Sequence, residues 1–417
     1  MTDAQLFALA IGVQKPWFIS KLNLDLEKKE LNIEVDFEKG SEFIYVDEQT
    51  GEQDIYKAYD TSEKKWRHMN FFQYKCFLIC RVPRVKTKIG KVKQVKTPWE
   101  GVSSGFTLLF EALILQFSKI MPVNRICEMM DIYDGKIWKM LNIYTEKCRE
   151  MADYSLVKSV GLDETSITGH NYVTTFVDMD QKKTLFVTLG KDSETVKEFA
   201  EDLAQHKGFP ENIKVASCDM SPAFVKGIEE NLPNAKITFD KFHVMKIINT
   251  QVDNVRKEEL NTNPLLKDTK YVFLKNQKNY TENQKKKYEK IKLNGLNTKS
   301  FKAMEMRESF QQIYNAPNIV AFEILLEDWC NWVVKSEIPQ MQKVEKMVRK
   351  QWNKIVSYAE SKITNAILEG FNSIFQAAKN KARGYKKFET IKAIIYLLTG
   401  KLDFTLINKF CATHSVL

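Results

Sequence analysis

The sequence lacks any run of about 18 apolar residues, the length that a membrane-spanning helix requires. Its beginning, MTDAQLFALAIGVQK, has no basic segment before the short apolar stretch, unlike a secretion signal. The seven cysteines are scattered, odd in number and set among apolar residues, which indicates free buried thiols rather than a disulfide framework. These absences exclude a membrane span, argue against secretion and predict a cytoplasmic protein in a reducing compartment.

Basic residues are in excess and are concentrated in stretches. The 417 residues carry a net charge of +10, and their number predicts two to three domains. Residues 81–97 contain seven basic and no acidic side chains, residues 262–302 contain eleven lysines against three acids, and residues 372–387 contain five basic side chains against none. Any one stretch could be an ordinary solvated surface. Several of them along one chain favour a polyanionic partner, above all double-stranded DNA.

Periodicity divides the first third of the chain into two parts. Residues 20–97 contain short segments in which apolar and polar residues alternate, and this pattern predicts a small β-rich module. The clearest alternation is that of Leu31, Ile33, Val35 and Phe37. After the breaker-rich segment TPWEGVSSG the periodicity becomes helical.

Three helices are predicted next, over residues 106–120, 122–130 and 134–149. Pro122 is expected to open the second helix, and Asp134 is expected to be the N-cap of the third. Three helices with short joints are typical of a helix-turn-helix unit, although any small three-helix bundle gives the same pattern. If this unit reads DNA, the third helix offers Lys136, Lys139 and Asn142.

From Val157 onward the pattern alternates between strands and helices. VKSVGLD, NYVTTFVDM and KTLFVTLG are three successive predicted strands, and SETVKEFAEDLAQHKG, IKVASCD, SPAFVKGIEENL and AKITFD follow as helix, strand, helix and strand. A three-strand meander followed by this alternation is the order of the ribonuclease-H-like fold, a mixed sheet flanked by helices. Asp219 ends its strand just before Ser221 and Pro222 open a helix, at the edge where α/β folds present their sites.

Asp163, Asp219 and Glu369 have the pattern of a metal-dependent site that cuts phosphodiesters. The first two close predicted strands, the third lies on a helix downstream, and such carboxylates can hold two Mg²⁺ or Mn²⁺ ions. Neighbouring strand residues point to opposite faces, so Asp163 and Glu164 cannot both serve one site. Parity favours Asp163, and Glu164 remains the alternative if the strand ends earlier.

Glu369 lies on a helix predicted over residues 363–383, which has a polar stripe and an apolar face. We expect the apolar face to pack on the sheet. The stripe begins with oxygen ligands and ends with cations, which suits a helix that lies between a metal site and DNA phosphates. Alternatively, the stripe is an ordinary polar face that points to solvent. The stripe consists of Asn365, Glu369, Asn372, Gln376, Lys379 and Arg383, and the apolar face of Ile363, Ile367, Phe371, Ile374 and Ala378.

Three segments, VGLDETSITGHNYVTTFVDMD, VASCDMSPAFVKGIEENLPNAKITFDKFHVMKIIN and SKITNAILEGFNSIFQAAKNKARGYKKFET, resemble bacterial insertion-sequence transposases of the DDE class, specifically the ISL3 family. The resemblance continues upstream through KWRHMNFFQYKCFLICRVPRV and PWEGVSSGFTLLFEALILQFSKIMPVNRI, so it covers nearly the whole chain. It implies a ribonuclease-H-like catalytic domain with Asp163, Asp219 and Glu369 as the DDE triad. It also implies cleavage at terminal inverted repeats and strand transfer, by a homodimer or higher oligomer on nucleoid DNA.

The resemblance further implies a division of the chain. The expected parts are a zinc-ribbon-like β-module (1–100), a helix-turn-helix unit (101–152), the first part of the catalytic core (153–261), a helical lysine-rich insertion (262–357) and the remainder of the core (358–417). Members of the family typically carry two Cys-x-x-Cys pairs in the first part. The matching stretches here, residues 43–51 and 85–91, contain no cysteine, so we expect no zinc.

Further residues are assigned from pattern and resemblance. Asp240 and His243, at a predicted strand-to-helix junction, would support the active site together with Asn365. His243 would contact the scissile phosphate or assist proton transfer, or alternatively only hydrogen-bond the core. Contacts with DNA phosphates are expected from Arg84, Lys86, Lys88, Lys91, Lys93, Lys379 and Arg383.

Two other functions are compatible with much of this pattern. A transposase-derived DNA-binding regulator would bind without cutting, but it would not need three intact acids. A ribonuclease-H-like nuclease or junction resolvase would cut without strand transfer. The bipartite N-terminal DNA-binding region favours recognition of element ends over that second alternative.

Overall fold

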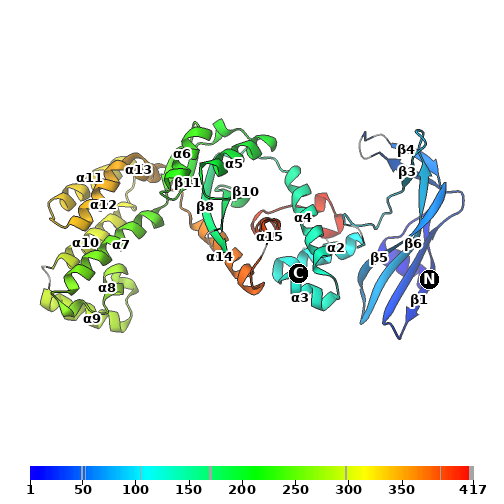
Figure 1. Ribbon diagram of the computed structural model, residues 1–417, viewed down its shortest axis with the longest axis horizontal. Helices are drawn as coiled ribbons and strands as arrows, with labels where there is room; N and C mark the ends of the chain where they lie inside the picture. The colour runs from blue at the N-terminus through cyan, green and yellow to red at the C-terminus, as the bar shows by residue number, and fades with distance from the viewer. Residues whose placement is uncertain are drawn as a thin grey trace. The chain divides into compact units, whose positions relative to one another are not determined.

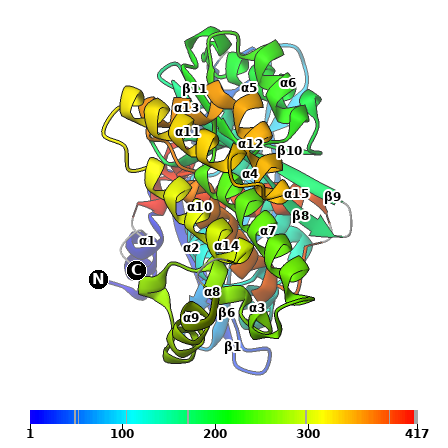
Figure 2. The ribbon, with the colours of Figure 1, turned by 90° about the vertical axis from the view of Figure 1, so that its left-hand side faces the viewer.

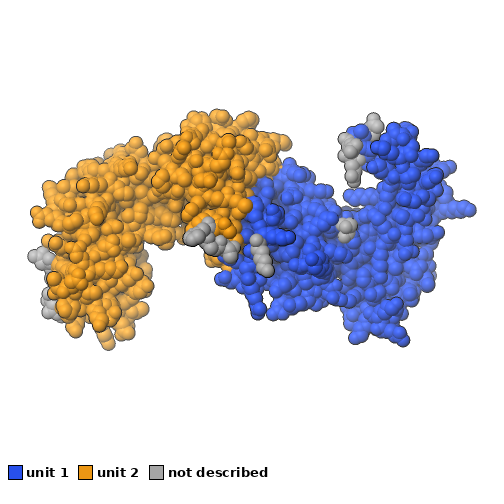
Figure 3. All heavy atoms as spheres, viewed as in Figure 1, with its two compact units in different colours: residues 1–151, 377–417 blue, residues 152–376 orange. Residues whose placement is uncertain are grey.

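The protein is a mixed α/β chain of two compact units (Figure 1). One unit consists of residues 1–151 with 377–417, and the other of residues 152–376 (Figure 3). Within the described part of the chain, no helix is long and apolar enough to cross a bilayer. The computed structural model describes residues 1–47, 50–51, 53–103, 105–168, 171–295, 298–385 and 387–412.

The first unit begins with β-structure, as its alternating sequence predicts. Its elements are α1 (Asp3–Ile11), β1 (Trp17–Asp25), β2 (Glu30–Phe37), β3 (Glu42–Val46), β4 (Gln53–Lys57), β5 (Asp60–Phe71), β6 (Tyr74–Lys86) and β7 (Val92–Gln94). One sheet has the order β1-β2-β6-β5 with β7 beside β6, and β3 and β4 form a separate hairpin. Leu31, Ile33 and Val35 are buried on one face of the sheet with Cys76 and Cys80.

The same unit contains a helical part. It comprises α2 (Leu108–Ile120), α3 (Val123–Met130), α4 (Asp134–Glu150) and α15 (Phe388–Thr399), with short 3₁₀ turns at Phe404–Leu406 and Lys409–Cys411. The three predicted helices are confirmed, but Tyr133 is the N-cap of α4 and Asp134 is its first residue. That prediction was wrong by one position; a carboxylate in the first turn still faces the positive end of the helix dipole. The buried carboxylate of Glu111 on α2 accepts a hydrogen bond from the hydroxyl of Tyr144 on α4 (2.9 Å).

The second unit is built on a five-stranded sheet. Its first elements are β8 (Ser159–Thr168), β9 (Asn171–Asp178), β10 (Lys183–Leu189), α5 (Ser193–Gln205), β11 (Val215–Cys218), α6 (Pro222–Asn231) and β12 (Lys236–Phe239), with a 3₁₀ turn at Pro210–Asn212. The strand order is β10-β9-β8-β11-β12. The first three strands form an antiparallel meander, and β11 runs parallel to both β8 and β12. These strands and helices lie close to where the sequence predicts them, except that β8 continues five residues beyond Asp163, which therefore lies within the strand and does not close it.

A group of helices follows β12. It comprises α7 (Lys241–Leu260), α8 (Lys270–Leu274), α9 (Glu282–Gly295), α10 (Lys299–Ile313), α11 (Ile319–Val334), α12 (Pro339–Lys350) and α13 (Trp352–Ser361), with 3₁₀ turns at Pro264–Leu266 and Gln277–Asn279. α7 packs against α10 and α12 (Figure 2). α13 returns to the sheet, where the Ser357 hydroxyl donates to the backbone carbonyl of Ile237 on β12 (2.8 Å). α14 (Ala366–Lys381) comes next and carries Glu369.

Candidate active site

Asp163 and Asp219 lie near the same edge of the sheet. β8 and β11 are parallel neighbours in which Gly161 pairs with Ser217. Asp163 is two residues beyond Gly161, and Asp219 is two residues beyond Ser217, directly after the end of β11. Carboxyl ends of parallel strands are where α/β sheets present ligand sites. The backbone N–H of Ser221 donates to Asp219 Oδ1 (2.9 Å), which holds this side chain at the start of α6.

The carboxylate of Asp163 is partly buried and held at both oxygens. Its Oδ1 accepts from the backbone N–H of Glu164 (2.9 Å), and its Oδ2 accepts from the side-chain amide of Asn372 on α14 (2.8 Å). Burial raises the pKa of Asp163 to about 6, and the negative charge of Asp219 adds to this, while the hydrogen bonds and His243 oppose it. A carboxylate that has lost solvation and faces a second carboxylate gains from a nearby cation. The pair therefore fits a hard divalent ion.

The two faces of β8 separate Asp163 from Glu164. A Cβ added to Gly161 would lie 2.7 Å from Leu368 Cδ1, so this face of β8 packs directly against α14. Asp163 has the same parity as Gly161 and lies on that face. Glu164 has the opposite parity, and its Oε1 lies 3.9 Å from Lys191 Nζ. The structure thus directs Asp163, and not Glu164, towards the helix that carries Glu369.

α14 begins later than predicted because Asn365 belongs to the segment before it. The buried Asn365 side chain accepts from the hydroxyl of Ser217 on β11 (2.6 Å). Its backbone N–H donates to Asp240 Oδ1 (3.1 Å). These bonds fix the entry of α14 at the ends of β11 and β12, so the helix runs over 366–381 rather than 363–383.

The face of α14 that meets the sheet agrees with the prediction only in part. Leu368 and Phe375 are the buried residues of α14, whereas Ile374, assigned to the apolar face, is 45% exposed. Asn372 shares the buried face, because its amide oxygen accepts from the Thr165 hydroxyl on β8 (2.6 Å) and its nitrogen donates to Asp163. Ile363, Ile367 and Phe371 of the predicted apolar face do pack against the buried cluster of Val177, Met179 and Leu368, and the hydrogen bonds of Asn372 bring part of the polar stripe to β8 as well.

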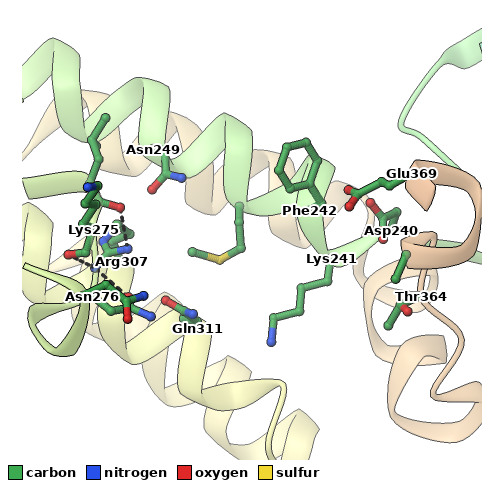
Figure 4. Close-up of a pocket in the computed structure, with 14 residues that line it drawn as sticks. Asp240, Lys241, Phe242, Asn249, Lys275, Asn276, Arg307, Gln311, Thr364 and Glu369 are labelled. Carbon is green, nitrogen blue, oxygen red and sulfur yellow. Dashed lines mark hydrogen bonds between the residues drawn. The ribbon is translucent and has the colours of Figure 1, made fainter. Parts of the chain in front are cut away.

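Glu369 lies in the first turn of α14 and is exposed. Together with Asp240 it lines a hollow of about 530 Å³ (Figure 4). Within the described residues, no three His, Cys, Asp or Glu side chains are gathered closely enough to hold a metal ion as they stand. The structure thus brings Asp163 and Asp219 together but leaves Glu369 directed into the hollow. Three carboxylates remain a donor set suited to Mg²⁺ or Mn²⁺.

Asp240 and His243 connect the start of α7 to the two aspartates. Asp240 is only 2% exposed, and its Oδ2 lies 3.3 Å from His243 Nδ1. The interaction with Asp240 raises the pKa of His243, as do the charges of Asp163 and Asp219, while burial opposes the shift. His243 is therefore an electrostatic neighbour of the aspartate pair, and it in turn lowers the pKa of Asp163. Thr165, which holds Asn372 of α14, and Ser217, which holds Asn365 just before α14, were not identified from the sequence.

The side chains predicted to bind DNA differ in their exposure and in whether an acidic side chain already pairs with them. Arg84 donates to Asp60 (2.6 Å from Nε to Oδ1), and Lys88 pairs with Asp54. Asn142 is partly buried and lines a small hollow with residues of α15. Lys379 is partly buried. The remaining predicted residues are exposed, namely Lys86, Lys91, Lys93, Lys136, Lys139 and Arg383.

Two comparisons relate the chain to known proteins. Residues 160–395, more than half of the chain, match the family model described as transposase, of the DDE class and ISL3 type. The chain is also 23% identical over 353 residues to the transposase for insertion sequence element IS1001 of Bordetella parapertussis, an alignment that covers 80% of this chain and 84% of that protein. The matched family range includes Asp163, Asp219 and Glu369.

Proposed function

The chain belongs to the ISL3 family of DDE transposases, and on this premise we propose that it binds the terminal inverted repeats of an insertion sequence, cleaves the DNA at the element's ends and transfers the freed strands to target DNA. The hydrogen bond from Asn372 to Asp163 (2.8 Å) carries the proposal. It joins the helix of Glu369 to the strand of Asp163, and Asp219 follows the neighbouring strand. The two aspartates therefore lie near one edge of the sheet, and the helix that carries Glu369 is held beside them.

The topology of the second unit supports a ribonuclease-H-like core. An antiparallel meander followed by two parallel strands, in the order β10-β9-β8-β11-β12, agrees with that fold. In the proposed division, the helical insertion over 262–357 separates the core segments 153–261 and 358–417. Residues 1–100 and 101–152 would be the β-module and a helix-turn-helix unit that bind the terminal repeats, in a homodimer or higher oligomer that joins two ends.

The proposed chemistry is phosphoryl transfer. Asp163, Asp219 and Glu369 would hold two Mg²⁺ or Mn²⁺ ions, which when bound polarise the phosphate and lower the pKa of water. In cleavage, a water molecule loses a proton as its oxygen bonds to phosphorus, the bond between phosphorus and the 3′-oxygen breaks, and the leaving 3′-oxygen takes up a proton. In strand transfer, the freed 3′-hydroxyl loses its proton, bonds to a target phosphorus and displaces a target 3′-oxygen. His243, paired with Asp240, would contact a phosphate oxygen or assist proton transfer.

Cleavage is expected to depend on Mg²⁺ or Mn²⁺ and not on zinc. Cys76 and Cys80 are buried on β6, and burial raises the pKa of each thiol to about 12, which disfavours the thiolate that zinc binds. The DNA flanking the gene supplies the terminal repeat for a gel assay. Chelation by EDTA should stop cleavage while the circular dichroism spectrum is unchanged. Stoichiometric zinc by elemental analysis, or cleavage in excess EDTA, would contradict this chemistry. Binding of the repeat without any cleavage would favour the alternative function of a DNA-binding regulator.

We expect the two N-terminal parts to have different roles in DNA binding. The helix-turn-helix unit would read the base sequence, and the β-module would bind phosphates. Replacing the exposed Lys139 of α4 with alanine should narrow the preference for repeat over random DNA by about 1–3 kcal/mol, because the third helix would enter the major groove. Replacing both Lys91 and Lys93 should weaken the binding of repeat and random DNA alike. It should also reduce the slope of log affinity against log salt concentration by roughly two units. Fluorescence anisotropy at several salt concentrations measures both. The opposite pattern would make the β-module the reading head.

A further inference from the structure

Two adjoining hollows follow α7 away from Glu369. The first, of about 530 Å³, is lined by Glu369 at one end, and the second, of about 350 Å³, is lined by Lys257 and Lys270. Both hollows share Phe242, Met245, Asn249 and Leu274, so they are an adjoining pair along the helix. We refer to the pair as the α7 groove. From Phe242 to Lys257 the helix extends about 22 Å.

Beyond Asp240 and Glu369 at one end, the α7 groove is lined mainly by cations, amides and apolar side chains. The side chains of Lys241, from the start of α7, and Gln311, from α10, extend into the first hollow (Figure 4). Lys246 and Lys270 line the second hollow. Among the described residues, these three lysines have no carboxylate partner. The one acid of the second hollow, Asp253, is already paired with Arg256 (2.8 Å) and Lys257 (3.1 Å). The groove therefore favours an anionic chain.

Two features of the α7 groove indicate what kind of anion it takes. Phe242 is 56% exposed although it stands at the start of a long helix beside charged residues. Asn249 lies between the two hollows, and its buried Oδ1 has no hydrogen-bond partner within the described residues. A buried acceptor of this kind is costly unless a ligand supplies a donor. An aromatic ring for stacking, an amide acceptor and flanking lysines are together typical of single-stranded nucleic-acid binding.

We propose that the α7 groove binds an unpaired DNA strand of a few nucleotides that leaves the cleavage site. Phe242 stacks on a base, Asn249 accepts from a base amino group, and Lys241 and Lys246 contact phosphates. At 3.4 Å per stacked nucleotide, the groove has room for at most about six. Hollows of this size bind groups as large as a small molecule. Each can therefore take an unpaired base, but neither can take a base-paired duplex. This inference rests on the proposed function, because the strand begins at the carboxylates that cut it.

The test compares two end-bearing duplexes that differ only in a four-nucleotide unpaired extension beyond the cleavage site. The full chain should bind the extended duplex more tightly than the blunt one. Phe242→Ala should reduce the ratio of the two affinities by at least about fivefold, because base–aromatic stacking is lost. Lys226→Ala, which removes an exposed lysine on α6 of the same unit, is the matched control and should leave the ratio unchanged. Circular dichroism verifies that each variant is folded.

A photocrosslink gives a second readout that does not depend on a variant. With 5-iododeoxyuridine in the extension, irradiation should link the DNA to the peptide that contains Phe242. The proposal would be overturned if Phe242→Ala left the affinity ratio unchanged or if the crosslinks were confined to other peptides. It would also be overturned if Phe242→Ala weakened binding of blunt and extended DNA equally, because the groove would then hold duplex. A wild-type chain that cleaves ends but ignores the extension refutes only this inference. A chain that neither binds nor cleaves ends refutes the proposed function itself.

Discussion

Replacing Asp163 or Asp219 with asparagine, or Glu369 with glutamine, is expected to reduce cleavage of end-bearing DNA by roughly 10³-fold or more, because each change removes a charge that holds a divalent cation. Binding of the same DNA should stay near wild type. The amide keeps the size of the side chain, and at position 163 one oxygen can still accept from Asn372. Single-turnover cleavage on gels measures the first quantity, and fluorescence anisotropy measures the second.

Glu164→Gln is the matched control for Asp163→Asn. The two residues are adjacent on β8, but Glu164 lies on the other face and pairs with Lys191 (3.9 Å). Its neutralisation should therefore leave cleavage close to wild type. If Glu164→Gln abolished cleavage and Asp163→Asn did not, the functional carboxylate would be the one on the other face of β8. Near-wild-type cleavage by any one triad variant would remove that residue from the mechanism.

The elements of the second unit could be predicted because their signals are local. The short strand-like segments of β8, β9 and β10, which polar turns separate, and the Ser221–Pro222 pair at the start of α6 depend only on neighbouring residues. The N-cap of α4 was misassigned because Asp134 is a good residue both for a cap and for a first turn. The sheet-facing side of α14 was only partly predicted, because its apolar periodicity identifies Ile363, Ile367 and Phe371 but not the hydrogen bonds that Asn372 makes to β8.

The site was partly predictable for the same reason. Asp219 and Asp240 end strands just before helices, a position visible in the sequence. The partner of Asp163 was not visible, because Asn372 is separated from it by 209 residues. Asn372 did lie on the predicted polar stripe of α14, three residues after Glu369. That stripe was therefore an informative signal, although the sequence alone could not tell a sheet-facing asparagine from one that faces solvent.

Gly161→Ala is expected to lower cleavage by about 10²-fold without altering any carboxylate. The added Cβ would lie 2.5 Å from Met179 Sδ and 2.7 Å from Leu368 Cδ1. Both side chains are buried together with Val177 in a small cluster, so they have little room to rotate. The contact is relieved when α14 moves away from β8, which shifts Glu369 relative to Asp163. A displacement of about 1 Å in a catalytic group can cost a factor of this size.

Gly370→Ala distinguishes this displacement from a general effect of alanine near the site. Gly370 lies on α14 next to Glu369, and an added Cβ there meets no atom within 4 Å. Because alanine is favoured over glycine inside a helix by roughly 0.5–1 kcal/mol, this variant should keep full cleavage and unfold at the same or a higher temperature. Single-turnover rates of both variants on one end-bearing duplex, with anisotropy to confirm equal binding, make the comparison. If Gly161→Ala cleaved as fast as Gly370→Ala, close packing of Leu368 on β8 would not set the position of Glu369, and the hydrogen bonds of Asn372 would have to do so alone.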